Sequence, residues 1–349
     1  MAEQVARHLG APIREERWKG RMPGRDRLAG ELGVNRKTVE RALVRLEERG
    51  VLASGGAGRR REIIEGRGMT PRSAENLRVK ILAYETEDLG RGFFVDLQRR
   101  LGQLGHEVDF SRKTMISMGM DPERIAKHVA SEEADSWVVI SGPRGVLEWF
   151  AQQSVPTFAL FGRRHGLPIA GVGPDKSPVL RGLVVRLTGL GHRRIVLLSR
   201  KERRLPSPGL LERNFLEALE AHGIETGAYH LPDWDETPAG LRDRLDAMFK
   251  LTPPTALILD EAFFLQVAQM HLARRGIFAP QDISIVCQDS DPSFGWHFPS
   301  IAHIHWPSEP IVRRVVQWVK HLAHGRKDVR QSFTKSVFVE GGTIGPPGD

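Results

Sequence analysis

The sequence predicts an α/β protein with two parts: an N-terminal winged helix-turn-helix and a larger bilobal domain built on two doubly wound parallel sheets. Two observations lead to this prediction. Residues 1–68 carry 16 Lys and Arg against 10 Asp and Glu, so they hold +6 of the net charge of +8. From residue 77 onward, short apolar runs alternate with amphipathic segments of helical length, which is the pattern of parallel strands covered by helices on both faces.

Residues 22–61 contain two amphipathic helices joined by a tight turn. Their apolar stripes are Leu28, Ala29 and Leu32 in the first helix, and Val39, Ala42, Leu43 and Leu46 in the second. Gly33 stands where a left-handed residue ends a helix, and Asn35 is a favourable N-cap for the next one. A turn of about three residues is typical of a helix-turn-helix.

Positive charge at the start of the second helix indicates DNA binding. Arg36 and Lys37 stand where the helix dipole disfavours cations, and Arg41 lies on the same face. Phosphates and base edges explain cations at this position. A plain helical hairpin would account for the apolar stripes but not for the local charge.

A wing follows the second helix. Val51 and Leu52 predict a short strand, Ser54–Gly58 a glycine-rich tip, and Arg59–Ile64 a returning strand that begins with three arginines. We therefore predict that the DNA-contacting residues are Arg25, Asn35, Arg36, Lys37, Thr38, Glu40, Arg41, Arg59, Arg60 and Arg61. The cations of the helix would meet the major groove, and those of the wing would meet phosphates or the minor groove.

This segment resembles the winged helix-turn-helix of the GntR family of bacterial transcription regulators. The matching residues are Leu28, Ala29, Leu32, Gly33, Val34, Arg36, Thr38, Val39, Ala42, Leu43, Leu46, Glu47, Gly50, Val51 and Leu52. The family's Ser-Glu-Arg before the first helix is Gly24-Arg25-Asp26 here, and Glu40 stands where the family often has Arg. The resemblance implies an operator-binding module at residues 1–64, whose first helix covers 2–18.

A polar stretch with Gly and Pro at residues 65–76 predicts a linker between two domains. The chain has a single cysteine, Cys287, which excludes an intrachain disulfide and fits a reducing compartment. No apolar leader and no run of about 18 apolar residues are present, so we expect a cytoplasmic protein that does not span a membrane.

Residues 77–345 predict two tandem βα units. The strands of the first unit are expected at 77–84, 107–110, 137–140 and 157–161, with helices at 93–104, 122–131 and 145–152. The second unit is expected to have helices at 179–190, 210–221, 239–249 and 261–275, with strands at 194–198, 227–231, 256–259 and 283–287. Two doubly wound units in tandem form a cleft between them, which predicts a bilobal ligand-binding module.

The second unit resembles the effector domain of LacI/GalR-type regulators, which is similar to periplasmic sugar-binding proteins. The matching residues are Val172–Asp175, Leu190–Ile195, Asn214, Phe215, Ala218, Leu219, Pro254–Ala256, Gly276, Pro280, Asp282–Val286, Gln288 and Asp289. By this analogy lobe 1 covers about 77–174 and 306–333, and lobe 2 covers about 175–305 and 334–345. A GntR-type head on such a body is a known regulator architecture.

The resemblance also places candidate effector contacts. Asp289 matches the family's hydroxyl-binding Asp, Glu261 takes the place of its Asn, and Trp234 matches an aromatic residue that stacks on a sugar ring. Tyr84, Glu85, Phe93 and Phe94 are added because they follow the first strand, where ligands enter doubly wound sheets, and Trp306 because it flanks the return crossing. The family's binding Arg and Asp are replaced by Leu211 and Gly162.

These features predict a homodimeric regulator that binds double-stranded, palindromic DNA and is controlled by a small molecule, with a sugar as the first candidate. No catalytic constellation, cofactor motif or metal-ligand spacing is legible, so we expect neither an enzyme nor a bound cofactor. Two alternatives stay open at this point. In the first alternative, the chain binds DNA and its lobes serve only for dimerisation. In the second, the chain is a small-molecule-binding protein without operator specificity.

Overall fold

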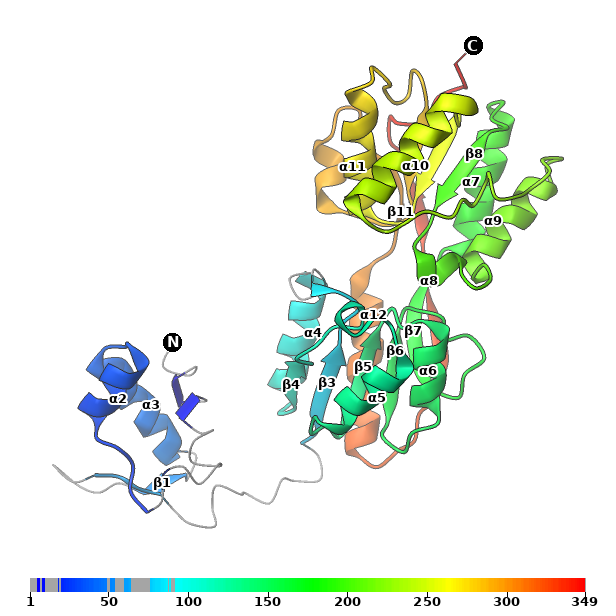
Figure 1. Cartoon of the computed structure of the whole chain (residues 1–349). Coiled ribbons are helices and arrows are strands. Elements are labelled where there is room, and N and C mark those ends of the chain that lie inside the picture. The colour runs from blue at the N-terminus through cyan, green and yellow to red at the C-terminus, as the bar shows by residue number, and fades with distance from the viewer. Residues whose placement is uncertain are drawn as a thin grey trace. The chain divides into compact units, whose positions relative to one another are not determined.

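The computed structural model describes residues 5–6, 8–9, 18, 20–48, 51–53, 60–63, 76–86, 88 and 92–348. The chain divides into two compact units, residues 1–75 and residues 76–349 (Figure 1). The expected wing tip with Arg59, most of the expected first helix at 2–18 and most of the linker at 65–76 lie outside the described residues.

The described residues of the first unit include a pair of helices and a small hairpin. They are α2 (Arg25–Leu32), α3 (Arg36–Glu48), β1 (Leu52–Ala53) and β2 (Glu62–Ile63), with β1 antiparallel to β2. Gly33 ends α2 with a φ of 62°, a conformation that glycine adopts without strain. Asn35 caps α3, because its Oδ1 accepts a hydrogen bond from the Thr38 amide at 2.8 Å. The predicted apolar stripes meet in one core with Val5, Ala6, Leu9 and Met22.

The second unit consists of two lobes. Among the described residues, lobe 1 holds a six-stranded parallel sheet in the order β12-β7-β6-β5-β3-β4. Its strands are β3 (Arg78–Leu82), β4 (Glu107–Phe110), β5 (Ser136–Ile140), β6 (Thr157–Leu160), β7 (Ala170–Asp175) and β12 (Gln331–Lys335). Helices α4 (Gly92–Gln103) and α12 (Ser308–Ala323) cover one face, and α5 (Pro122–Ala130) and α6 (Arg144–Ala151) cover the other (Figure 1). A short 3₁₀ helix, η2 (Ile116–Met118), follows β4.

Lobe 2 has the same layered arrangement on a five-stranded sheet, ordered β13-β11-β10-β9-β8 in the described part of the chain. Its strands are β8 (Ile195–Leu198), β9 (Ala256–Leu259), β10 (Ser284–Cys287), β11 (Ala302–His305) and β13 (Val337–Val339), of which β13 is antiparallel to β11. Helices α7 (Ser177–Gly189) and α9 (Leu210–Glu220) lie on one face, and α10 (Pro238–Leu251) and α11 (Ala262–Ala273) on the other. Two short helices complete the lobe, α8 (Lys201–Arg204) and η3 (Pro292–Trp296).

The chain passes between the lobes after β7, after β11 and after β12, because β7 and β12 belong to the sheet of lobe 1 and β11 and β13 to that of lobe 2. β12 continues to Lys335, beyond the expected end of lobe 1 at 333. The predicted fold class, an α/β protein with parallel sheets and a bilobal domain, is confirmed. Within the described residues no helix is long and apolar enough to cross a membrane.

One predicted strand is wrong. Residues 227–231 form turns rather than a strand. They still run along the free edge of β8, where the Leu197 amide donates a hydrogen bond to the His230 carbonyl at 2.8 Å. Pro232 follows at once and has no amide hydrogen to extend such a ladder. The segment therefore occupies the position of an edge strand without forming one.

Candidate functional site

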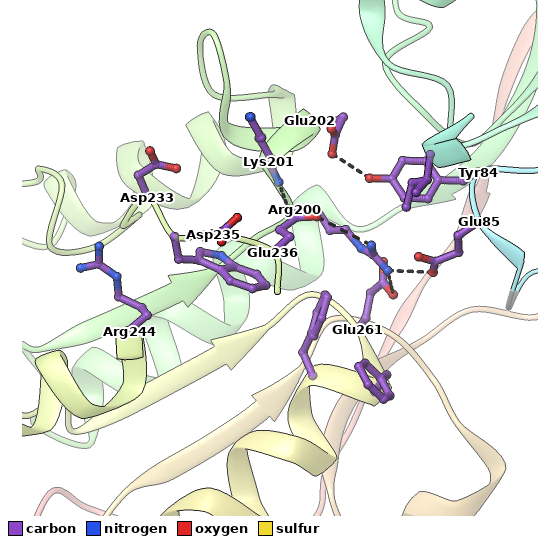
Figure 2. A pocket seen from close by; sticks show the side chains of 14 residues that line it. Tyr84, Glu85, Arg200, Lys201, Glu202, Asp233, Asp235, Glu236, Arg244 and Glu261 are labelled. Atoms are coloured by element: carbon purple, nitrogen blue, oxygen red, sulfur yellow. Dashed lines mark hydrogen bonds and ion pairs between the residues drawn. The ribbon is translucent and has the colours of Figure 1, made fainter. Parts of the chain in front are cut away.

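A cavity of about 970 Å³ opens between the two lobes, where loops follow the carboxyl ends of β3, β8 and β9 (Figure 2). This is the end of a doubly wound sheet at which ligands bind. The residues that line it are Tyr84, Glu85, Ile116, Arg200, Lys201, Glu202, Asp233, Trp234, Asp235, Glu236, Arg244, Glu261, Phe263 and Phe264. Lobe 1 supplies Tyr84, Glu85 and Ile116, and lobe 2 supplies the others.

The Arg200 guanidinium lies at the centre of this site. Its Nε and Nη2 donate to the two carboxylate oxygens of Glu261 at 2.7 and 2.8 Å, and its Nη2 also donates to Glu85 Oε1 at 2.8 Å. Glu236 Oε2 lies 3.8 Å from Nη1. The guanidinium carbon is 5.1 Å from the ring centroid of Tyr84 and 4.9 Å from that of Phe264. Arg200 is thus held by carboxylates and aromatic rings from both lobes.

Two side chains of lobe 1 make further hydrogen bonds to lobe 2. The Tyr84 hydroxyl donates to Glu202 Oε2 at 2.7 Å (Figure 2). Arg163, which follows β6 of lobe 1, donates from Nη1 to the carbonyls of Glu202 and Leu205 at 3.2 and 3.1 Å. Its Nη2 donates to the Ser207 carbonyl at 3.1 Å. Hydrogen bonds from these side chains of lobe 1 therefore join it to lobe 2.

Burial shifts the acid–base properties of the groups around Arg200. Burial raises the pKa of Glu85 above its ordinary value, although Arg200 acts in the opposite direction, and burial also raises the pKa of Glu236. Asp260, which lies directly after β9 and accepts a hydrogen bond from the Arg200 amide, has its pKa raised to about 7 by burial and then by the charge of Glu261. Burial alone would lower the pKa of Arg200, but Glu261 and Glu85 raise it above its ordinary range. The site holds its arginine as a cation among partly destabilised carboxylates.

Half of the effector residues suggested by the sequence line the cavity. Tyr84, Glu85, Trp234 and Glu261 are among its walls. Trp234 is 6% exposed and its Nε1 donates to the Ser199 carbonyl at 3.0 Å, so most of this ring belongs to the core of lobe 2.

Phe93, Phe94, Asp289 and Trp306 do not line the cavity. Phe94 is buried in the core of lobe 1, and Phe93 packs edge-on against Phe94 and Trp306. Trp306 Nε1 donates to Asp289 Oδ1 at 2.7 Å, and Lys176 Nζ lies 3.8 Å from the same oxygen. These side chains form a second cluster, which pairs Asp289 with the chain's own groups.

Arg200 lies at the centre of the cavity, and sequence reasoning missed it. It follows β8 in lobe 2 at nearly the same distance as Tyr84 and Glu85 follow β3 in lobe 1. Tyr84 and Glu85 were selected because ligands enter doubly wound sheets where the strands end, and this rule would have selected Arg200 as well. The acidic residues at 233–236 carry a weaker signal, because they precede a helix and follow no strand.

In the first unit, several predicted DNA-contacting cations are exposed to solvent. Arg36, Lys37 and Arg41 are exposed on α3, and Arg60 is exposed just before β2. The Arg36 Nε lies 3.1 Å from Asp26 Oδ1, and Arg25 Nη1 lies 3.7 Å from Glu40 Oε2. Exposed ion pairs of this kind are weak and are readily exchanged for phosphate contacts.

Arg61 and Thr38 have internal roles. Arg61 Nη2 donates to Glu40 Oε1 at 2.7 Å and its Nε to Glu47 Oε1 at 2.6 Å, which ties the wing to α3. The hydrogen bond from Arg61 holds the pKa of Glu40 below its usual range. Thr38 donates its hydroxyl to Asn35 Oδ1 at 2.9 Å as part of the helix cap. Within the described residues, the exposed cations of the predicted set are therefore Arg25, Arg36, Lys37, Arg41 and Arg60.

Among the described residues, no group of three or more His, Cys, Asp or Glu side chains is placed to hold a metal ion. The titratable side chains that come together in the cavity are carboxylates paired with guanidinium groups. We find no nucleophile paired with a base among the residues that line this cavity.

Comparison with known families matches residues 184–344 to the periplasmic binding protein-like domain. This match covers lobe 2 and the last part of lobe 1. Comparison with curated protein sequences gives no match.

Solved structures of LacI-family regulators share the fold. A LacI family transcriptional regulator from Mycobacterium smegmatis superposes with a TM-score of 0.62 at 15% identity, covering 77% of this chain and 99% of that chain. The regulator CelR in complex with cellobiose gives 0.62 at 17% identity, covering 92% of this chain and 100% of that chain. A LacI family regulator from Enterococcus faecium with bound ribose gives 0.59 at 15% identity, covering 77% and 99%. At these identities the likeness shows a common fold.

Proposed function

We propose that this protein is a DNA-binding transcriptional regulator controlled by a small molecule that binds between its lobes. The observation that carries this proposal is the exposed row of cations on α3, in a helix pair with helix-turn-helix spacing. The resemblance of residues 22–61 to the GntR winged module supports the same reading. The structural similarity of the second unit to LacI-family regulators also supports the proposal of a transcriptional regulator.

The cavity between the lobes supports control by a small molecule. A volume of about 970 Å³ lies in the range of pockets that hold cofactors or drug-sized ligands. The structures of CelR and of the Enterococcus faecium regulator contain cellobiose and ribose, so sugars are the first compounds to test. Binding at this place changes the contacts between lobes, because Tyr84, Glu85 and Glu202 belong both to its walls and to the lobe contacts.

An exposed apolar surface on lobe 2 supports a homodimer. Met270 is exposed on α11, and Trp296 and Phe298 are 90% and fully exposed on the segment that begins with η3. Gln266 Nε2 donates to Ser293 Oγ at 3.3 Å, which joins these two segments into one surface. A second copy of the chain is its expected partner, since the Lac repressor structure that shares this fold is a dimer. Trp296→Ser should lower the dimer fraction in sedimentation experiments.

The mechanism couples the lobes to the DNA-binding heads. Two heads of a dimer contact the two half-sites of a palindrome, so their spacing determines operator affinity. A ligand that changes lobe closure alters this spacing, at a coupling free energy of about 1 to 3 kcal/mol. The chain between residues 64 and 75 must transmit the change.

The experiment is a selection of bound fragments from genomic DNA by the purified full chain, at about 150 mM salt so that nonspecific phosphate contacts are weakened. A palindromic site should be enriched. The variant that replaces both Arg36 and Lys37 with alanine should lose this enrichment. Arg181→Ala, which removes an exposed charge from α7, is the control and should retain it. Equal recovery of random DNA by the wild-type chain would refute the proposal.

A second candidate is a regulator whose lobes only dimerise. The contacts of Arg200 favour it, because the chain's own guanidinium already bridges the lobes. In that case the selected DNA would be bound with the same affinity in the presence of any small molecule that is tested.

A further inference from the structure

Carboxylates outnumber the guanidinium that they surround in the cavity. Glu261 makes two hydrogen bonds to Arg200, Glu85 makes a third from the other lobe, and Glu236 lies 3.8 Å away. One positive charge is therefore shared by several carboxylates. Arg200 cannot neutralise all of them.

The side chains that line the cavity have a similar imbalance, although one of the acidic ones, Asp233, is paired with Arg204 outside the lining. Among the lining residues, all within the described part of the chain, six are Asp or Glu and three are Arg or Lys. The acidic ones are Glu85, Glu202, Asp233, Asp235, Glu236 and Glu261, and the basic ones are Arg200, Lys201 and Arg244. Carboxylates at partly buried positions are unfavourable unless a cation compensates them. Burial raises the pKa values of Glu85 and Glu236, and the charge of Arg200 opposes this effect at both residues.

Aromatic rings complete a cage around the guanidinium. The Tyr84 ring comes from lobe 1 and the Phe264 ring from lobe 2, with their centroids 5.1 and 4.9 Å from the guanidinium carbon. Phe263 lines the same cavity and is 65% exposed. Aromatic faces combined with carboxylates are the arrangement that recognises organic cations in proteins.

We propose that the cavity binds an organic cation of the amine or guanidine class, whose charged group takes the place of the Arg200 guanidinium among Glu85, Glu236 and Glu261. As a statement about the regulator's effector, this rests on the proposed function. A neutral sugar would leave the excess negative charge of the cavity walls unchanged, whereas a cation that enters the cavity reduces it by one charge while Arg200 stays part of the chain. Because Arg200 bonds Glu85 across the cleft, its displacement also breaks a bond between the lobes.

Arg200→Ala in the full-length chain gives the test, since it empties the cage and leaves its carboxylates in place. Methylguanidinium and urea are both small, planar and rich in N–H donors, but only the first is charged. Calorimetric titration at about 10 mM probe, far below denaturing concentrations, should show methylguanidinium bound at least about tenfold more tightly than urea. Adding Glu261→Gln should weaken this binding by about tenfold, because the group that makes two of the bonds loses its charge.

Two controls isolate the cage. The wild-type chain, in which Arg200 fills the cage, should bind methylguanidinium more weakly than the Arg200→Ala variant. Arg181→Ala removes an exposed cation from α7, outside the cavity, so its methylguanidinium affinity should stay close to that of the wild type. If the Arg200→Ala variant does not fold, Arg200→Gln replaces it in the comparison of methylguanidinium with urea.

Equal affinity of the variant for methylguanidinium and urea would overturn the proposal, and so would tighter binding of cellobiose or ribose than of methylguanidinium. The DNA selection is a separate readout. If an operator is enriched but methylguanidinium is not preferred, the proposed cation site is refuted and the proposed DNA-binding regulator stands. If methylguanidinium is preferred but no operator is enriched, the proposed regulator is refuted and the proposed cation site stands.

Discussion

Arg200 of lobe 2 and Glu85 of lobe 1 form an ion pair at 2.8 Å. In a bilobal binding fold a ligand commonly makes such a bridge between the lobes. Here the side chain that bridges them is covalently part of the protein. A ligand must therefore compete with an existing contact, and its effect on the lobes depends on which bonds it replaces.

Loss of Arg163 should open the lobes. Its guanidinium donates to the carbonyls of Glu202, Leu205 and Ser207 across the cleft, and hydrogen bonds from a charged donor contribute about 1.5 to 3 kcal/mol before solvent exposure reduces them. In Arg163→Ala we expect a larger radius of gyration by small-angle X-ray scattering.

Arg144→Ala is the matched control for this prediction. Arg144 also donates to a backbone carbonyl, that of His165, but both residues belong to lobe 1. Its removal should leave the radius of gyration unchanged. An equal expansion in both variants, or in neither, would mean that Arg163 does not hold the lobes together.

Replacement of Arg36 should weaken binding to the selected operator. The residue is exposed at the start of α3, where a recognition helix meets base edges. We expect Arg36→Ala to cost about 1 to 3 kcal/mol at the operator, and less on random DNA. The measurement is a titration by fluorescence anisotropy with both DNAs at several salt concentrations. An equal loss on both DNAs would show that Arg36 contacts only phosphate.

Arg60 and Arg61 are neighbours with opposite expected effects. Arg61 is tied to Glu40 and Glu47, so Arg61→Ala should lower the free energy of unfolding of the first unit by about 1 to 2 kcal/mol. Arg60 is exposed, so Arg60→Ala should leave stability unchanged and reduce DNA affinity. Urea unfolding of the full chain gives the first quantity and anisotropy the second. A stable Arg61→Ala variant that loses DNA affinity would reverse these assignments.

Periodicity predicted most of the helices and strands. Some strands were missed because they contain residue types that are uncommon in strands. β7 contains two glycines and a proline, residues that rarely indicate a strand. The structure explains one of them: a Cβ at Gly171 would lie 2.5 Å from the side chain of Arg164, which crosses β7 at this point. Glycine is there because a buried arginine needs the space. Periodicity along one strand does not contain this information.

Only half of the predicted effector residues line the cavity, and the reason is again that the sequence does not show which side chains meet in the fold. Strand ends mark where a cleft lies, and this rule placed Tyr84 and Glu85 correctly on its wall. It does not say which charges converge there from separate loops, so Arg200 and Glu236 were missed. Likewise, local charge indicated that Arg61 contacts DNA, whereas the fold pairs it with Glu40. Residue types can be read along the chain, but their partners are set by tertiary structure.

Asp260 should make the protein less stable as the pH rises. Burial raises the pKa of this carboxyl to about 7, with Glu261 adding to the effect and Arg203 and Arg200 opposing it. In the unfolded chain an aspartate titrates near about pH 3.9. Between these values the folded state binds more protons than the unfolded state, so the free energy of unfolding falls from about pH 4 to about pH 7 and then levels off.

Asp260→Asn should remove this part of the pH dependence, because the amide stays neutral and its oxygen still accepts the hydrogen bond from the Arg200 amide. Urea unfolding at about pH 5 and about pH 8 measures it, and the wild type should lose more stability between the two than the variant. Asp243→Asn, at an exposed position on α10, is the control and should follow the wild type. The other shifted groups are common to all three chains and cancel in the comparison. Parallel pH profiles for wild type and Asp260→Asn would mean that Asp260 is ionised in the folded protein throughout this range, and the carboxylates around Arg200 would then be better compensated than their burial indicates.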